Sequence, residues 1–150
     1  MNRYQFAIWV ALLLCPLSGL AQEIFGAQDL DSYVLQLNVQ CPITCGDQWA
    51  VNSVTADGDT VWVELEAPGV LDVFLSTLTE DSPGVKRLWK NQMLSFGNQW
   101  ERLMDLLVEA GHSLVLFIRP QDSDSSAYVA FNPDELKNEQ PASRKADPNR

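Results

Sequence analysis

Cys41 and Cys45 are the residues whose type and spacing are best suited to chemistry. Three residues, Pro42-Ile43-Thr44, separate them. In an oxidising compartment two such cysteines normally pair. Along an extended strand, however, their α-carbons would lie about 13 Å apart, beyond the limit of about 7 Å for a disulfide. We therefore predict a Cys41–Cys45 disulfide in a chain that folds back at Pro42, and two free or intermolecular thiols are the alternative.

A functional Cys-x-x-x-Cys site is a second alternative. This spacing resembles that of the copper-delivering thioredoxin-fold proteins, in which a distant histidine completes the site. His112 is the single histidine and would take that role beside Cys41 and Cys45. The chain departs from that family because residues 46–49 lead into a strand pattern, where the family opens a helix. The family's aspartate next to the histidine is also missing. Thiol-redox or copper chemistry at Cys41, Cys45 and His112 is therefore kept only as the alternative, and no metal or other cofactor is predicted.

Two carboxylates and a tryptophan are the other candidates. Trp62, Glu64 and Glu66 alternate along a strand pattern and therefore share one face. Two carboxylates on one face can act as an acid–base pair, but on a wet strand face they more simply provide solvation. An exposed tryptophan can anchor a protein partner or a glycan; the alternative is that the first helix or the C-terminal tail covers it. We predict these three residues as the candidate binding residues.

Catalytic signatures are absent from the sequence. No serine or cysteine lies in a nucleophile elbow, and a single histidine leaves little room for a triad. Asp122 and Asp124 alternate like calcium ligands, but the glycine and the distal glutamate of an EF-hand loop are missing. No catalytic residue is predicted, and a non-enzymatic role is favoured.

Residues 1–21 have the pattern of a secretory signal peptide. Arg3 precedes an apolar run over residues 6–14, and the small residues Gly19 and Ala21 stand where a signal peptidase reads. A membrane anchor is the alternative, but the run is too short to span a hydrocarbon core of about 30 Å. Lipidation at Cys15 is a further alternative, although Leu14 is larger than the residue a lipobox requires. We expect a secreted or periplasmic protein without stable membrane insertion after cleavage.

The charge of the chain limits its partners. Ten Lys and Arg residues stand against 20 Asp and Glu residues, which gives a formal net charge of −10. Such an acidic chain repels phosphate backbones and anionic lipid, so nucleic-acid binding is not expected. Another exported or envelope protein is the expected partner.

Hydrophobic periodicity predicts the elements that position these residues. Residues 30–39 have helical spacing at Leu30, Val34 and Leu37, although residues 33–39 also alternate like a strand. Residues 49–56 and 60–67 alternate as two strands, and Asp57-Gly58 between them predicts a type I′ turn.

The second half of the chain repeats this order. Residues 71–111 are mostly helical, with a start at Ser82-Pro83 and an end at Gly111. Residues 112–119 and 127–131 follow as two strands. We expect one α+β domain over residues 22–136, a two-layer sandwich of α-β-β-α-β-β order. Its four-stranded sheet would be antiparallel with helices on one face, and residues 137–150 would form a disordered polar tail.

Three short motifs in this order resemble small exported bacterial proteins of uncharacterised function. They are Asn38-x-x-Cys41-Pro42, Val54-x-x-Asp57-Gly58 and Ala110-Gly111. The resemblance covers residues 30–136, has weakly specific motifs and implies no activity or catalytic residue. Cys45 lies outside it, because only the Cys-Pro step belongs to the likeness. Together these patterns predict an exported, non-enzymatic domain that binds a protein or envelope component through an open sheet face.

Overall fold

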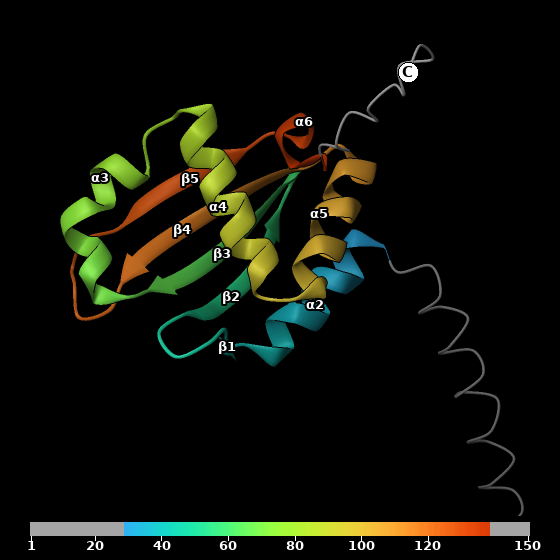
Figure 1. Ribbon diagram of the computed structural model, residues 1–150. Helices are drawn as coiled ribbons and strands as arrows, with labels where there is room; N and C mark the ends of the chain where they lie inside the picture. The colour runs from blue at the N-terminus through green and yellow to red at the C-terminus, as the bar shows by residue number, and fades with distance from the viewer. Residues whose placement is uncertain (1–28, 139–150) are drawn as a thin grey trace, which may run out of the picture.

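A five-stranded sheet with helices packed on one side forms the described part of the chain (Figure 1). This computed structural model describes residues 29–138. The elements, in chain order, are α2 (Leu30–Gln40), β1 (Ile43–Thr44), β2 (Ala50–Asp57), β3 (Thr60–Ala67), the 3₁₀ helix η1 (Gly69–Phe74), α3 (Leu75–Leu78), α4 (Pro83–Ser95), α5 (Asn98–Ala110), β4 (Ser113–Pro120), β5 (Ala127–Phe131) and α6 (Pro133–Leu136). The predicted signal peptide and residues 139–150 of the predicted tail lie outside the described residues.

The sheet is mixed, with the order β1-β2-β3-β4-β5. Strands β3 and β4 run parallel, from Thr60 opposite Ser113 to Ala67 opposite Pro120, and the other pairs are antiparallel. The α+β class is confirmed, but the predicted four antiparallel strands were wrong in two details. The helices between β3 and β4 return the chain to the end where β3 begins, which makes this pair parallel. The two-residue strand β1 was not predicted.

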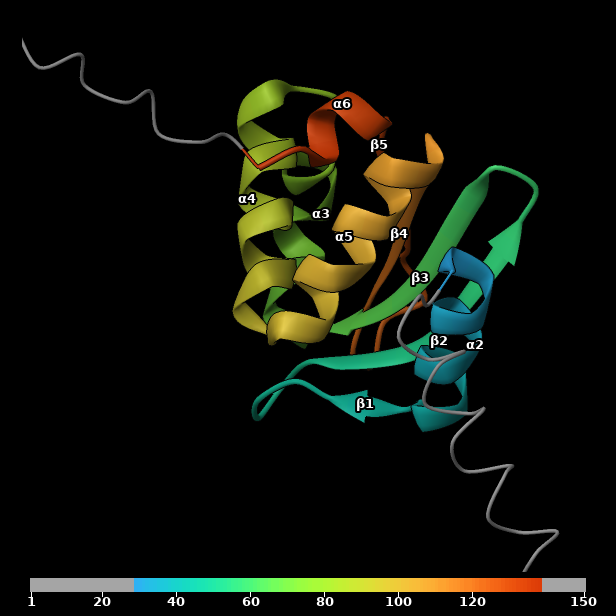
Figure 2. The ribbon, with the colours of Figure 1, turned by 90° about the vertical axis from the view of Figure 1, so that its right-hand side faces the viewer.

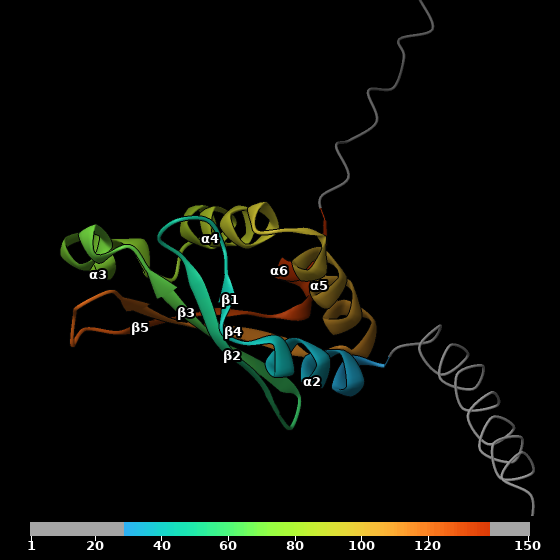
Figure 3. The same cartoon turned by 90° about the horizontal axis from the view of Figure 1, so that it is seen from below.

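The helices cover one face of the sheet. Helices α3, α4 and α5 lie on the same side of it in Figures 1 and 3. Helix α5 turns an apolar stripe toward the sheet, and its Trp100 is fully buried. Trp89 of α4 is also buried. The sheet contributes its alternate residues to the same core, including Val63 and Leu116, which are fully buried. Burial of these side chains is the main source of stability.

Helix α2 packs along β2 and against α5, with α4 on the far side of α5 (Figure 2). Its predicted helical face is buried, so the strand alternative for residues 33–39 was wrong. The Tyr33 hydroxyl donates to the Gln99 carbonyl at 3.0 Å, and the Asn38 side-chain oxygen accepts from the Val54 amide at 3.1 Å. These two bonds attach the two ends of the helix to α5 and to β2.

The turn and cap residues mostly behave as their types require. The Ser82 hydroxyl accepts from the Val85 amide at the start of α4, and Gly111 ends α5 with a φ of 68°. The β2–β3 turn differs from the expectation, because Asp57 pairs with Thr60 and the central residues are Gly58 and Asp59. Of these two, only Gly58 has a positive φ, at 60°. This pattern is that of a type II′ turn and not of the predicted type I′ turn.

Helices long and apolar enough to cross a membrane do not occur among residues 29–138.

Candidate functional site

The face of the sheet turned away from the helices carries the predicted binding residues. On β3 the buried side chains of Val61, Val63 and Leu65 alternate with those of Trp62, Glu64 and Glu66. The register aligns these with outward residues of β4 and β5. We call this surface the open face and define it by Trp62, Glu64, Glu66, Val115, Phe117, Arg119 and Tyr128.

Three aromatic rings from three strands form the centre of the open face. The Trp62 and Tyr128 ring centroids lie 6.2 Å apart in an edge-to-face arrangement, and those of Phe117 and Tyr128 lie 5.0 Å apart. Trp62 is 37% exposed and Tyr128 is 58% exposed, so the first helix does not cover Trp62. Exposed apolar groups gathered in this way mark interaction sites more often than isolated ones do.

Charged groups border these rings. The Arg119 guanidinium lies 5.3 Å from the centroid of the Phe117 ring, and its Nη1 lies 3.7 Å from Glu64 Oε1. Glu66 accepts hydrogen bonds from the Gln121 side-chain amide at 3.1 Å and from that of Asn52 at 3.4 Å. The two carboxylates therefore have separate partners, and nothing in this arrangement couples them as an acid–base pair.

An acidic cavity lies at the Glu66 end of the open face. It has a volume of about 590 Å³ and is lined by Glu66, Arg119, Pro120, Gln121, Asp122, Ser123 and Asp124. Because Glu66 and Arg119 also belong to the open face, the two surfaces are continuous. Three carboxylates line the cavity against a single arginine.

Sequence reasoning found only part of this surface. Phe117 and Arg119 were missed because residues 112–119 look almost uniformly apolar. Phe117 and Arg119 alternate with Leu116 and Ile118, which are fully buried. This alternation could have indicated that Phe117 and Arg119 lie on the outward face. Tyr128 was also missed, because its contact with Trp62 depends on β4 lying between β3 and β5.

The cysteines lie in a corner between α2 and β1. Both are free thiols in the structure, so the predicted disulfide is not formed there and stays a prediction. The Cys41 thiol lies 3.4 Å from the Leu37 carbonyl, and the Cys45 thiol lies 3.5 Å from the Ile43 carbonyl. Burial raises the pKa of both thiols, and the neighbouring Cys41 raises that of Cys45 further. A raised pKa keeps the thiol protonated, whereas nucleophiles and metal ligands act as thiolates.

His112 lies far from that corner. Through the sheet register, Ile43 is level with Val51, Leu65 and Ile118. His112 precedes β4, six residues from Ile118, a distance of about 20 Å along the strand. The structure therefore does not bring His112 together with Cys41 and Cys45. Within the part of the chain that the structure describes, no group of three His, Cys, Asp or Glu residues could hold a metal ion.

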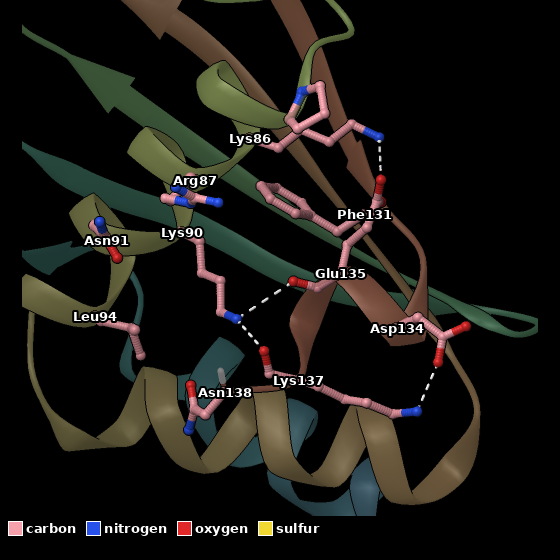
Figure 4. Close-up of a pocket in the computed structure, with 11 residues that line it drawn as sticks. Lys86, Arg87, Lys90, Asn91, Leu94, Phe131, Asp134, Glu135, Lys137 and Asn138 are labelled. Atoms are coloured by element: carbon pink, nitrogen blue, oxygen red, sulfur yellow. Dashed lines mark hydrogen bonds and ion pairs between the residues drawn. The ribbon is translucent and has the colours of Figure 1, made fainter. Parts of the chain in front are cut away.

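A second cavity lies between α4, β5 and α6, on the side of the sheet that carries the helices (Figure 4). Its volume is about 660 Å³, and Lys86, Arg87, Lys90 and Lys137 are among its lining residues. Lys86 lies 2.8 Å from Glu135 and 3.0 Å from Asp81. Lys90 donates to the backbone carbonyls of Glu135 and Lys137. These bonds attach α6 to α4, so we assign the lysines there a structural role.

Comparisons with known proteins identify the fold. No family model and no curated protein sequence matches the chain. A Pseudomonas aeruginosa protein that is inferred to be secreted has a similar structure, with a TM-score of 0.50 and 12% identity over 72% of this chain and 89% of that chain. EpsS, a pilotin of the Vibrio vulnificus type 2 secretion system, gives a TM-score of 0.45 and 14% identity over 73% and 89% of the two chains. At 12% identity, the likeness to the Pseudomonas protein is one of fold alone.

Proposed function

We propose that this chain is an exported, non-enzymatic protein that binds another exported or envelope protein through its open face. The observation that carries the proposal is the exposed aromatic cluster of Trp62, Phe117 and Tyr128 on the face opposite the helices. The N-terminal pattern of residues 1–21 supports export. The Pseudomonas protein of similar fold is itself inferred to be secreted, which agrees with this reading.

The residue types on the open face favour a protein partner. Tryptophan, tyrosine and arginine are the residues that most often dominate the energy of protein interfaces. Trp62, Tyr128 and Arg119 supply one of each. Tyrosine and tryptophan also lose little conformational entropy on binding because each has only two side-chain torsions. The sheet beneath holds them in a fixed register, which keeps the surface preorganised.

Site-specific photo-crosslinking in the cells that export the protein tests this function. A benzophenone-bearing phenylalanine at position 128 is expected to capture a defined partner. The same group at position 88 is the matched control, because Leu88 is 61% exposed but lies on α4. Trp62→Ala in the position-128 protein should abolish the product. Equal crosslinking from both positions, or a product that Trp62→Ala leaves unchanged, would overturn the proposal.

A further inference from the structure

We propose that the segment bound by the open face is basic, and that an arginine or lysine of another protein stacks on the Trp62–Tyr128 rings while a second pairs with Glu66. This inference rests on the proposed function and adds the chemistry of the partner. Three observations carry it: the ring geometry, the charge around the rings and the spacing along β3.

The rings offer electron-rich faces to a cation. A guanidinium or ammonium group is attracted to the face of an aromatic ring within about 6 Å. The open face already makes one such contact, between Arg119 and Phe117 at 5.3 Å. Trp62 and Tyr128 meet at 87°, so their faces form a corner, and both side chains are exposed. A cationic side chain of a partner can enter this corner and contact both rings.

The negative charge around the rings also favours a positively charged partner. Glu66 accepts hydrogen bonds from the Asn52 and Gln121 side-chain amides, while Arg119, its neighbour on β4, makes its ion pair with Glu64. The adjoining cavity adds Asp122 and Asp124 to the acidic surface. With a formal net charge of −10, the chain attracts basic partners over a distance and repels a second copy of itself. With three carboxylates and one arginine lining the cavity, a basic segment gains an electrostatic attraction there that an acidic or neutral segment lacks.

The strand sets the spacing of the two cations. Trp62 and Glu66 are four residues apart on one face of β3, a separation of about 13 Å. An extended peptide covers the same distance in four residues. The best ligand is therefore an extended segment with two basic residues separated by three others, and it lies along β3.

Titration of the purified exported chain with a defined peptide tests the proposal. The probe is a short Ser- and Ala-rich peptide with two arginines separated by three residues, and the matched control replaces both by glutamine. Binding is followed by the NMR signal of the Trp62 indole N–H, which Trp62→Phe identifies. We expect saturable shifts with the arginine peptide only. Tyr128→Ala and Glu66→Gln should each weaken binding about fivefold, and Leu88→Ala should not.

Several results would overturn the proposal. Equal binding of the arginine and glutamine peptides would remove the charge argument, and so would unchanged affinity in Glu66→Gln. The double variant Arg144→Gln with Lys145→Gln tests the chain's own C-terminal segment as the occupant. If it changes the chemical shift of the Trp62 indole N–H without any peptide present, the open face binds that segment. Self-association that Tyr128→Ala abolishes would assign it to a second copy.

The two proposals fail in different ways. If position 128 crosslinks a partner while the arginine peptide does not bind, the basic segment is wrong and the binding function stands. If neither experiment gives a signal that depends on Trp62, the function itself is wrong.

Discussion

At the scale of single residues, burial decides what the two cysteines do. Cys45 is 7% exposed and belongs to the hydrophobic core, and Cys41 packs against it. Burial raises the pKa of both thiols, which disfavours the thiolate that redox or copper chemistry uses. The same burial suits a pair that closes a small loop in an oxidising compartment.

We therefore predict that Cys41 and Cys45 form a disulfide in the exported protein. Thiol titration of the unfolded protein should detect no free thiol before reduction and two after it. Cys41→Ser with Cys45→Ser should lower the free energy of unfolding by about 2 kcal/mol, because the unfolded chain loses a short closed loop. Urea denaturation of the oxidised protein and the variant measures this difference.

The reduced wild-type protein is the control for that measurement, because it keeps both sulfur atoms but lacks the bond. Its stability should lie close to that of the double serine variant. Two titratable thiols in protein taken directly from the exported fraction would contradict the prediction and make this corner the first place to look for activity.

Glycines at two helix termini provide a second test at the residue scale. A Cβ at Gly111 would meet nothing within 4 Å, but the φ of 68° is one that L-residues adopt only at a cost. Gly111→Ala should therefore lower the free energy of unfolding by about 1 kcal/mol. Gly84→Ala is the matched control, because Gly84 also has open space around it and lies in the first turn of α4 without a positive φ. This control should be neutral or stabilising, and equal losses in the two variants would show that φ is not the cause.

At the scale of elements, one ion pair attaches α6 to α4. Lys86 lowers the pKa of Glu135 from its ordinary value of 4.5, and Glu135 raises that of Lys86 above 10.5. The Glu135 contribution to stability is present above pH 4.5 and is lost as the pH falls through the lowered value. The Lys86 contribution is present below pH 10.5 and is lost as the pH rises through the raised value. The pair therefore stabilises the fold across the neutral range.

Glu135→Gln should remove this contribution. We expect a loss of about 0.5 to 1 kcal/mol at pH 7, a modest value because the Glu135 side chain is 34% exposed. The difference from wild type should shrink at acid pH, where the wild-type carboxylate is itself protonated. Urea denaturation at the two pH values measures it, and Asp134→Asn, which alters a more exposed pair, is the control. A difference that persists unchanged in acid would assign the effect to the capping role of Glu135 at Asn132.

Local elements were the part of the fold that the sequence predicted best. Strands β3 and β5 have the predicted bounds because alternation and turn residues mark both ends. The Ser82 and Gly111 caps were also correct, since their side-chain and backbone requirements are local. Strand β1 was missed because two residues, Ile43 and Thr44, are too few to show a period.

At the scale of the whole molecule, the predicted strand pairing was wrong where segments distant in sequence pair in the sheet. Nothing in residues 60–67 or 113–120 alone indicates that they pair in parallel. That pairing aligns Glu64 with Phe117 and so with Tyr128, which creates the open face. The sequence could therefore supply Trp62, Glu64 and Glu66 as candidates, but not the aromatic cluster around them. The cluster is a product of topology, and it exists only when β4 lies between β3 and β5.

Because the aromatic cluster lies on the outward face of the sheet, we expect its residues to contribute less to stability than the residues on the buried face. Trp62→Phe with Tyr128→Ala removes the edge-to-face ring pair but keeps a ring at position 62 to cover the sheet, so the loss in free energy of unfolding should be about 1.5 kcal/mol. Leu116→Ala, on the opposite face of β4 and fully buried, should cost about 2 to 5 kcal/mol. Urea denaturation of the three proteins compares them under one condition. If the double variant were as destabilised as Leu116→Ala, the rings would be needed for folding, and their exposure would no longer support a binding role. If it stays close to wild type, the exposed ring pair is dispensable for the fold, as a surface kept for a partner would be.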